Sequence, residues 1–416
     1  MRTVRLDEGL YRTDADNGVT VLSEVLPGVR SAAVGIWFRA ASVHEPPAKM
    51  GVSHLLEHMV FKGTERRSAR DIALALEVRG GALDAFTSRD HTAYQARVLD
   101  EDLPRALDVL TDVVRNPVLR DGDLDLERKV VLEEISTVED TPDDLVFDLH
   151  AAALWPDHPY GFPILGTRDT VRALRADDLR DLHRRAYHPR HAVIAAAGSL
   201  DHEVLLKLLG RCGWFTFPAG PDLQPVEPAP AARRELRRVA RDTAQSHIVL
   251  GTDTFPYRDD RRHALLLLTT VLGGGMSSRL FQRIREELGL AYSVYAFQAF
   301  YRDGGVAGVY VGTHPSTAAQ AVDAIREELA RLGREGLEPR ELADAKQQVK
   351  GQATLALESP TARMYRLAGF PLHGEEYRTL DQTLAEIDAV DAGTVSAVAA
   401  EFFDPARQTV VWLGPQ

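Results

Sequence analysis

Hydrophobic and polar residues alternate in some stretches of the first half of the chain and recur every three to four residues in others. Alternation predicts strands at residues 19–25, after the turn pair Asn17-Gly18, and at residues 32–39. A helical period follows at residues 52–61. Further along, the pattern predicts a helix after Ser68, strands at 83–87 and 91–99, and helices at 103–116 and 123–138. The first half therefore combines a sheet with several helices.

The second half repeats this order of elements. It predicts a strand at 246–252, helices at 259–272 and 277–288, strands at 291–301 and 306–312, and then two long helices. We therefore predict an α+β fold of two similar lobes, formed by internal duplication, each a largely antiparallel sheet with helices packed on it.

A proline-rich stretch separates the two halves. Closely spaced prolines prevent both helix and sheet and favour an extended, fairly stiff connector. The prolines concerned are Pro218, Pro221, Pro225, Pro228 and Pro230. We therefore predict a first lobe at residues 1–217, a linker at 218–234 and a second lobe at 235–416.

Composition narrows the class of protein. The chain has 416 residues, of which 44% are hydrophobic and 26% charged, as expected for a globular protein and not for a disordered or fibrous one. Acidic side chains outnumber basic ones by 61 to 49, and the formal net charge of −12 disfavours nucleic acid as the main partner and favours basic ligands. The single cysteine, Cys212, excludes an intramolecular disulfide and a four-cysteine zinc site. Any metal must be held by His, Asp and Glu.

The opening segment and the apolar runs carry no sign of export. The first ten residues include Asp7 and Glu8 and lack the apolar core of a signal peptide. Apolar runs such as residues 264–268 are far below the roughly 18 to 20 residues that cross a bilayer. We expect a cytoplasmic protein with no membrane partner.

The predicted helix at residues 52–61 carries side chains that can bind a metal ion. At about 100° per residue, the side chains of His54, Glu57 and His58 share one face, with Leu55 and Leu56 opposite. Two imidazoles one turn apart can bind one metal ion, while the carboxylate between them is placed to hold a water molecule. This geometry is typical of a hydrolytic zinc site.

A pair of partly buried histidines on an amphipathic helix remains the alternative to a metal site. Catalytic zinc usually takes three protein ligands, so the metal hypothesis requires a third His, Asp or Glu. The helix at 123–138 offers Glu127 and Glu134, which are two turns apart and project from the same side. Both can face one metal ion.

Several segments resemble a known family. The sequences GVSHLLEHMVFKGT, GGALDAFTSRDHTAYQA and LERKVVLEEI are similar to those of the pitrilysin/insulinase family of inverted zinc metallopeptidases, above all the branch of mitochondrial processing peptidase and its single-chain bacterial relatives. The likeness continues through HPYGFPILGT and GGGMSSRLFQRIREELGLAYSVYA, so it covers nearly the whole chain.

The resemblance implies roles for particular residues. It makes Glu134, with 75 residues between it and His58, the third metal ligand, and Glu127 an acid that orients a ligand histidine. It also implies that Arg285 and Tyr292 hold the substrate backbone and stabilise the developing oxyanion. From the residues alone, Arg285 could equally be a solvated helix residue, and Tyr292 a core aromatic.

The same resemblance implies a substrate-binding edge strand, where a peptide adds as a further β-strand. The residues of this strand are Ala82, Leu83, Asp84, Ala85 and Phe86. Asp84 departs from the usual Asn of the family, and its carboxylate would repel a scissile carbonyl unless it is protonated or paired. It would instead favour basic side chains.

Together these features predict a zinc endopeptidase with one Zn²⁺ per chain, in which Glu57 is the general base. The resemblance implies a homodimer, and two lobes that enclose a chamber admitting short or unfolded peptides, with basic ones favoured. The competing hypothesis is a non-catalytic scaffold or binding subunit of the same fold; a zinc hydrolase acting on non-peptide amides is a third. The complete set of His54, Glu57, His58 and Glu134 argues against the scaffold.

Overall fold

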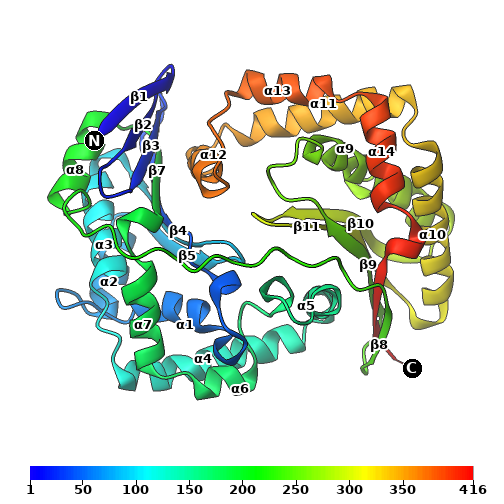
Figure 1. Cartoon of the computed structure of the whole chain (residues 1–416), viewed down its shortest axis with the longest axis horizontal. Helices are drawn as coiled ribbons and strands as arrows, with labels where there is room; N and C mark the ends of the chain where they lie inside the picture. Colours follow the sequence, from blue (N-terminus) through cyan, green and yellow to red (C-terminus); the bar gives the residue numbers. More distant parts are fainter. Residues whose placement is uncertain (416) are drawn as a thin grey trace. The chain divides into compact units, whose positions relative to one another are not determined.

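The computed structural model describes residues 1–415, and the chain forms two compact units, each built around its own sheet (Figure 1). The first unit comprises residues 1–135, 163–226 and 355–377; the second comprises 136–162, 227–354 and the chain from Arg378 onward. Each unit combines helices with a sheet of mostly antiparallel strands, so the predicted α+β class is confirmed.

The first unit contains a seven-stranded sheet in the order β1-β2-β3-β7-β4-β6-β5. Neighbouring strands are antiparallel except β3 and β7, which are parallel. In chain order the strands are β1 Arg2–Asp7, β2 Leu10–Asp14, β3 Thr20–Val25, β4 Ser31–Phe38, β5 Ala82–Thr87, β6 Thr92–Leu99 and β7 Ala192–Gly198. Strand β5 lies at one end of the order and therefore leaves one edge unpaired.

The helices of this unit bury one face of its sheet. Ile36 of β4 and Tyr94 of β6 belong to the same buried cluster as Leu55, Leu56 and Met59, which are all fully buried. The helices are α1 Val52–Val60, α2 Ala69–Glu77, α3 Leu103–Arg115, α4 Asp121–Glu139, α6 Arg168–Ala173, α7 Ala176–Ala186 and α8 His202–Arg211. Helix α4 continues from the first unit into the second.

The second unit contains a five-stranded sheet in the order β10-β11-β9-β12-β8. Its strands are β8 Leu236–Ala240, β9 Ser246–Thr254, β10 Ala291–Phe300, β11 Gly305–Thr313 and β12 Thr409–Gly414, and only β12 and β8 pair in parallel. Its helices are α5 Pro142–Leu154, α9 Arg262–Gly273, a π-helix at Phe281–Glu287, α10 Ala318–Glu335, α11 Pro339–Ala356, α13 Leu380–Ala389 and α14 Ala392–Phe402. The predicted helix at 277–288 is thus shorter and mostly of π type.

The two units differ from the predicted lobes at 1–217 and 235–416. Two helical segments are exchanged, so that each unit contains one segment from the other half of the sequence. Helix α12, Pro360–Leu372, belongs to the first unit, where Met364 and Leu367 are buried with Trp37 and Val193 of that sheet. Its apolar face covers the side of the sheet that the other helices leave open, which the order of elements along the chain did not reveal.

Helix α5 is exchanged in the opposite direction, from the first half of the sequence into the second unit. It lies in the sequence of the first half, yet Val146 and Ala153 are buried with Val249 of β9 and Val411 of β12 in the second unit. The predicted linker at 218–234 forms neither helix nor strand. Across residues 1–415, every helix is too short or too polar to span a bilayer.

Candidate metal centre

Helix α1 begins at a position that requires glycine. Gly51 has φ +87°, and a Cβ there would lie 2.5 Å from the carbonyl oxygen of Leu165. The carboxylate of Glu45 accepts hydrogen bonds from the backbone N–H groups of Gly51 and Ser53, each at 2.7 Å. A buried carboxylate thereby satisfies two of the N–H groups that the start of a helix leaves unpaired. These contacts set where α1 starts.

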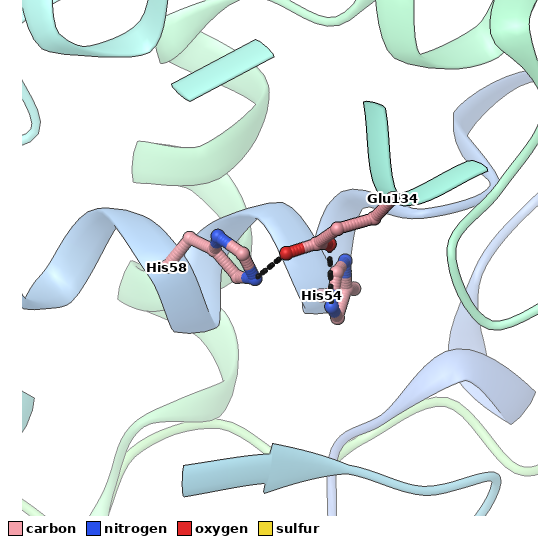
Figure 2. Close-up of side chains that lie close together, drawn as sticks. All are labelled: His54, His58 and Glu134. Carbon is pink, nitrogen blue, oxygen red and sulfur yellow. Dashed lines mark ion pairs between the residues drawn. The ribbon is translucent and has the colours of Figure 1, made fainter. Parts of the chain in front are cut away.

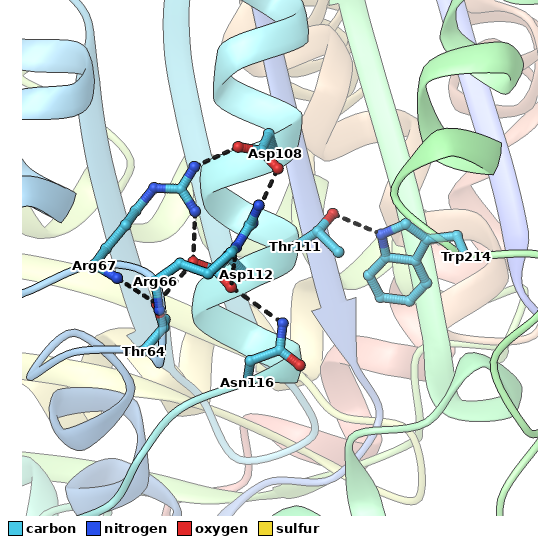
Figure 3. A network of polar contacts seen from close by, with 8 residues as sticks. All are labelled: Thr64, Arg66, Arg67, Asp108, Thr111, Asp112, Asn116 and Trp214. Atoms are coloured by element: carbon cyan, nitrogen blue, oxygen red, sulfur yellow. Dashed lines mark hydrogen bonds and ion pairs between the residues drawn. The ribbon is translucent and has the colours of Figure 1, made fainter.

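A polar network fixes the segment that follows α1 (Figure 3). The Thr64 hydroxyl donates to Oδ2 of Asp112 at 2.7 Å, and Arg66 and Arg67 form ion pairs with the same carboxylate and with Asp108 on α3. Burial favours protonation of Asp112, but the hydrogen bonds to its carboxylate outweigh that effect and lower its pKa. The carboxylate therefore stays charged and ties both ends of this segment to α3.

Between these two anchors, α1 projects His54 and His58 toward Glu134 of α4 (Figure 2). Nε2 of His54 lies 3.7 Å from Oε2 of Glu134, and Nε2 of His58 lies 3.6 Å from Oε1. One ligand atom from each residue lies within 4.8 Å of the other two. The three side chains predicted as metal ligands are thus brought together.

The donor set fits a divalent metal. Zinc bonds to nitrogen and oxygen at about 2.0–2.2 Å place tetrahedral ligand atoms about 3.3–3.6 Å apart, close to the two distances observed. Oε2 of Glu134 is buried without a hydrogen-bond partner, as is Nδ1 of His54. Burial, reinforced by the neighbouring His58, lowers the pKa of His54 to about 3. The imidazole is therefore neutral near pH 7, which is the form that binds metal.

Glu127 orients one of the imidazoles. Its Oε1 lies 3.1 Å from Nδ1 of His58, on the ring side opposite the nitrogen that faces Glu134. Glu127 is buried, and Lys62 contacts its other oxygen at 2.5 Å. A carboxylate at Nδ1 favours the tautomer that leaves Nε2 free to bind a metal ion.

Glu57 lies beside the ligands and is held from β5. The hydroxyl of Thr87 donates to Oε2 of Glu57 at 2.6 Å. Burial raises the pKa of Glu57, and the hydrogen bond from Thr87 opposes the rise. The charges of Asp84 and Glu134 raise this pKa further. A buried carboxylate with a raised pKa is suited to accept and return a proton.

A cavity of about 380 Å³ adjoins this carboxylate, with walls from α1, α2, β5 and α4. Glu57 and His58 line it together with Ile72, Leu83 and Asp84. The predicted substrate strand, residues 82–86, coincides with β5 and borders this cavity through residues 83–85. Strand β5, which forms the unpaired edge of the sheet, therefore borders the same cavity as Glu57 and His58.

The sequence matches known proteins over nearly its whole length. Residues 20–168 match the family described as Insulinase (Peptidase family M16), and residues 173–349 match the domain described as Peptidase M16 inactive domain. The chain is 41% identical to an uncharacterized zinc protease of Streptomyces coelicolor, over 97% of this chain and 89% of that protein. The chain belongs to peptidase family M16.

A further relative and two solved structures are also similar to this chain. The uncharacterized zinc protease YmxG of Bacillus subtilis is 39% identical, over 95% of this chain and 96% of its own. The crystal structure of a peptidase M16 inactive domain from Pseudomonas fluorescens superposes with a TM-score of 0.91 over 98% of both chains, at 20% identity. A protease from Helicobacter pylori gives a TM-score of 0.89 over 98% of this chain and 99% of its own, at 21% identity. These two structures share the fold of this chain.

Arg285 and Tyr292 form a pair within the M16 domain of the second unit. Nη1 of Arg285 donates to the carbonyl oxygen of Tyr292 at 3.1 Å, and the guanidinium lies 4.3 Å from the centre of the tyrosine ring. Arg285 comes from the π-helix, and Tyr292 from a bulge of β10, where the register with β11 shifts between Ala291 and Ser293. Tyr292 is 78% exposed, so it is not a core aromatic.

The sequence alone did not single out three residues of this M16 site. Thr87 holds the carboxylate of Glu57, Lys62 holds Glu127, and Glu45 caps α1. A signal for Thr87 was present, because alternation along β5 puts it on the same side as Leu83 and Ala85. Glu45 had no such signal, since its partners are backbone N–H groups.

Proposed function

We propose that this M16 chain is a zinc-dependent endopeptidase that hydrolyses short or unfolded peptides. The observation that carries the proposal is the convergence of His54, His58 and Glu134 within 4.8 Å. Two imidazoles and one carboxylate are a donor set of catalytic zinc, with a fourth position left open. The relatives named zinc proteases support the same metal. We expect one zinc ion per chain.

The chemistry divides between the metal and Glu57. Zinc at this site would lower the pKa of a water molecule and polarise the peptide carbonyl. Glu57 takes the proton from the attacking water and passes it to the leaving amine. Thr87 engages Oε2 of Glu57, which leaves Oε1 to accept that proton.

Two further parts of the chain are assigned to the substrate. The backbone of residues 82–86 would add the peptide as a further strand, supported by the unpaired edge of β5. Arg285 and Tyr292 would hold the peptide backbone and stabilise the charge that develops on the carbonyl oxygen. Tyr292→Phe removes only the hydroxyl and should lower kcat by about 100-fold with zinc content unchanged.

The net charge of −12 supports a preference for basic peptides. The enclosing chamber, the homodimer and the cytoplasmic location stay predictions. Sedimentation of the full chain at several concentrations tests the dimer.

The decisive experiment is cleavage of internally quenched peptides by zinc-loaded protein, with and without chelator. Glu57→Gln should retain zinc and lose about 100- to 10,000-fold in kcat, because it keeps the shape of the side chain and cannot accept a proton. Glu65→Gln is the matched control, since Glu65 is exposed outside the site. Full activity of Glu57→Gln would contradict the mechanism.

The same assay separates the alternatives. A non-catalytic scaffold would cleave none of the peptides in the wild-type, zinc-loaded form. A hydrolase of non-peptide amides would leave peptides intact and hydrolyse small amide substrates in a chelator-sensitive way.

A further inference from the structure

The open edge of β5 presents the backbone of alternate residues. Ser88 donates its N–H to the carbonyl oxygen of His91 and closes the β5–β6 hairpin. Paired residues alternate along an antiparallel ladder, so the N–H and C=O groups of residues 84 and 86 point toward β6. Those of Leu83, Ala85 and Thr87 point away from it. An added peptide strand would bond to these outward groups.

The side chain of Asp84 already accepts a hydrogen bond from one of these outward N–H groups. Its Oδ1 accepts the N–H of Ala85 at 3.0 Å, and its Oδ2 accepts from Nε2 of Gln95 at 3.1 Å. A substrate carbonyl that needs the Ala85 N–H must first displace this carboxylate. In the described part of the chain, no lysine, arginine or histidine forms an ion pair with Asp84. The carboxylate is exposed and can therefore take a cation from outside.

The surroundings of Asp84 suit a long basic side chain. Phe86 projects from the same side of β5, with its ring 6.1 Å from that of Tyr365 on α12. Both rings are partly exposed and can cover the methylene groups of a lysine or arginine. The negative charge of Asp84 reaches as far as Tyr365, whose pKa is raised by burial first and by this charge in addition.

We propose that Asp84 selects peptides carrying a lysine or arginine at the position that faces it across the added strand. The basic side chain pairs with the carboxylate, draws it off the Ala85 N–H, and so frees that donor for the substrate backbone. A neutral side chain leaves the donor capped. The proposal rests on the proposed peptidase function and assigns its substrate preference to one residue.

The test uses quenched peptides that differ by lysine or glutamine at a single position, scanned across the scissile bond. Wild-type protein should favour lysine at one position by roughly 10-fold in kcat/KM, and this ratio should fall at high salt. Asp84→Asn should reduce the ratio to about one, because it keeps the shape and removes the charge. Glu65→Gln removes the same net charge elsewhere and should leave the ratio unchanged. An unchanged ratio in Asp84→Asn would overturn the proposal.

A binding measurement separates this proposal from the proposed function. The zinc-loaded variants Glu57→Gln and Glu57→Gln/Asp84→Asn are titrated with the same peptides by fluorescence anisotropy. If wild-type protein cleaves no peptide but the lysine preference in Kd disappears with Asp84→Asn, the catalytic assignment fails and that of Asp84 stands. If the preference survives Asp84→Asn, or no lysine preference is found at any position, the assignment of Asp84 fails.

Discussion

At the scale of single residues, the site depends on how Glu57 is held. This carboxylate is buried, and Thr87 donates to one of its oxygens from a neighbouring strand. A hydrogen bond to a charged group contributes about 1.5–3 kcal/mol. Thr87 therefore acts on the orientation of the proposed base, since its hydroxyl donates to Glu57.

The substitution Thr87→Val tests this role. Valine has nearly the same shape and no donor, so kcat should fall by about 10-fold or more, with KM and zinc content close to those of the wild type. Thr87→Ser restores the hydroxyl and should recover most of the activity. Wild-type kcat in Thr87→Val would show that Glu57 needs no such support.

At the scale of elements, α1 presents the face that carries His54, Glu57 and His58 because its start is fixed from outside the helix. Glu45 caps it six residues before Gly51, and the cap position itself offers no side chain. Periodicity predicted a helix at residues 52–61, and the structure has it at Val52–Val60. The cap could not be predicted, because a carboxylate bound to backbone N–H groups leaves no pattern in the sequence.

The burial of Glu45 predicts a pH dependence of stability. Burial raises the pKa of Glu45 to about 7, although the hydrogen bonds from Ser53 and Gly51 oppose this rise. The folded chain therefore binds this proton more tightly than the unfolded chain does. The contribution of the protonated Glu45 to the stability of the folded chain is present in full below about pH 4.5. It is lost as the pH rises to about 7.

Denaturant unfolding of wild type and Glu45→Gln across this range measures the effect. The free energy of unfolding of the wild type should fall relative to that of the variant by up to about 3 kcal/mol between pH 4.5 and 7. A difference that stays constant with pH would contradict the assignment.

Irregular elements show a second limit of prediction from sequence. The segment around Arg285 was expected to be an ordinary helix, yet it forms a π-helix, and Tyr292 lies in a bulge. Both depend on local register, which alternation and helical periodicity do not encode. The spacing of His54, Glu57 and His58, by contrast, depends only on the helical repeat and could be predicted directly.

At the scale of the whole molecule, each unit is completed by a helix from the other half of the sequence. Helix α12 buries Leu367 in the first unit, and α5 buries Val146 in the second. Element order predicted two similar α+β units correctly. The order of elements could not reveal the exchange. The pattern of an amphipathic helix indicates that one face is buried, but it does not indicate which sheet covers that face.

Two core substitutions test the exchange. Leu367→Ala should cost about 2–5 kcal/mol and increase hydrogen exchange in the strands of the first sheet, above all β7. Val146→Ala should increase exchange in β9 and β12 of the second sheet. Loosening of the opposite sheet by either variant would contradict the division into units.

The central claim is that His54, His58 and Glu134 bind one divalent metal ion. The most direct test is zinc content after equilibrium dialysis of the purified chain, compared between wild type, Glu134→Ala and the neighbouring exposed control Glu133→Ala. We predict one zinc per chain in the wild type and in Glu133→Ala, and affinity reduced by more than about 100-fold in Glu134→Ala. Absence of zinc binding in the wild type, or full affinity in Glu134→Ala, would contradict the account.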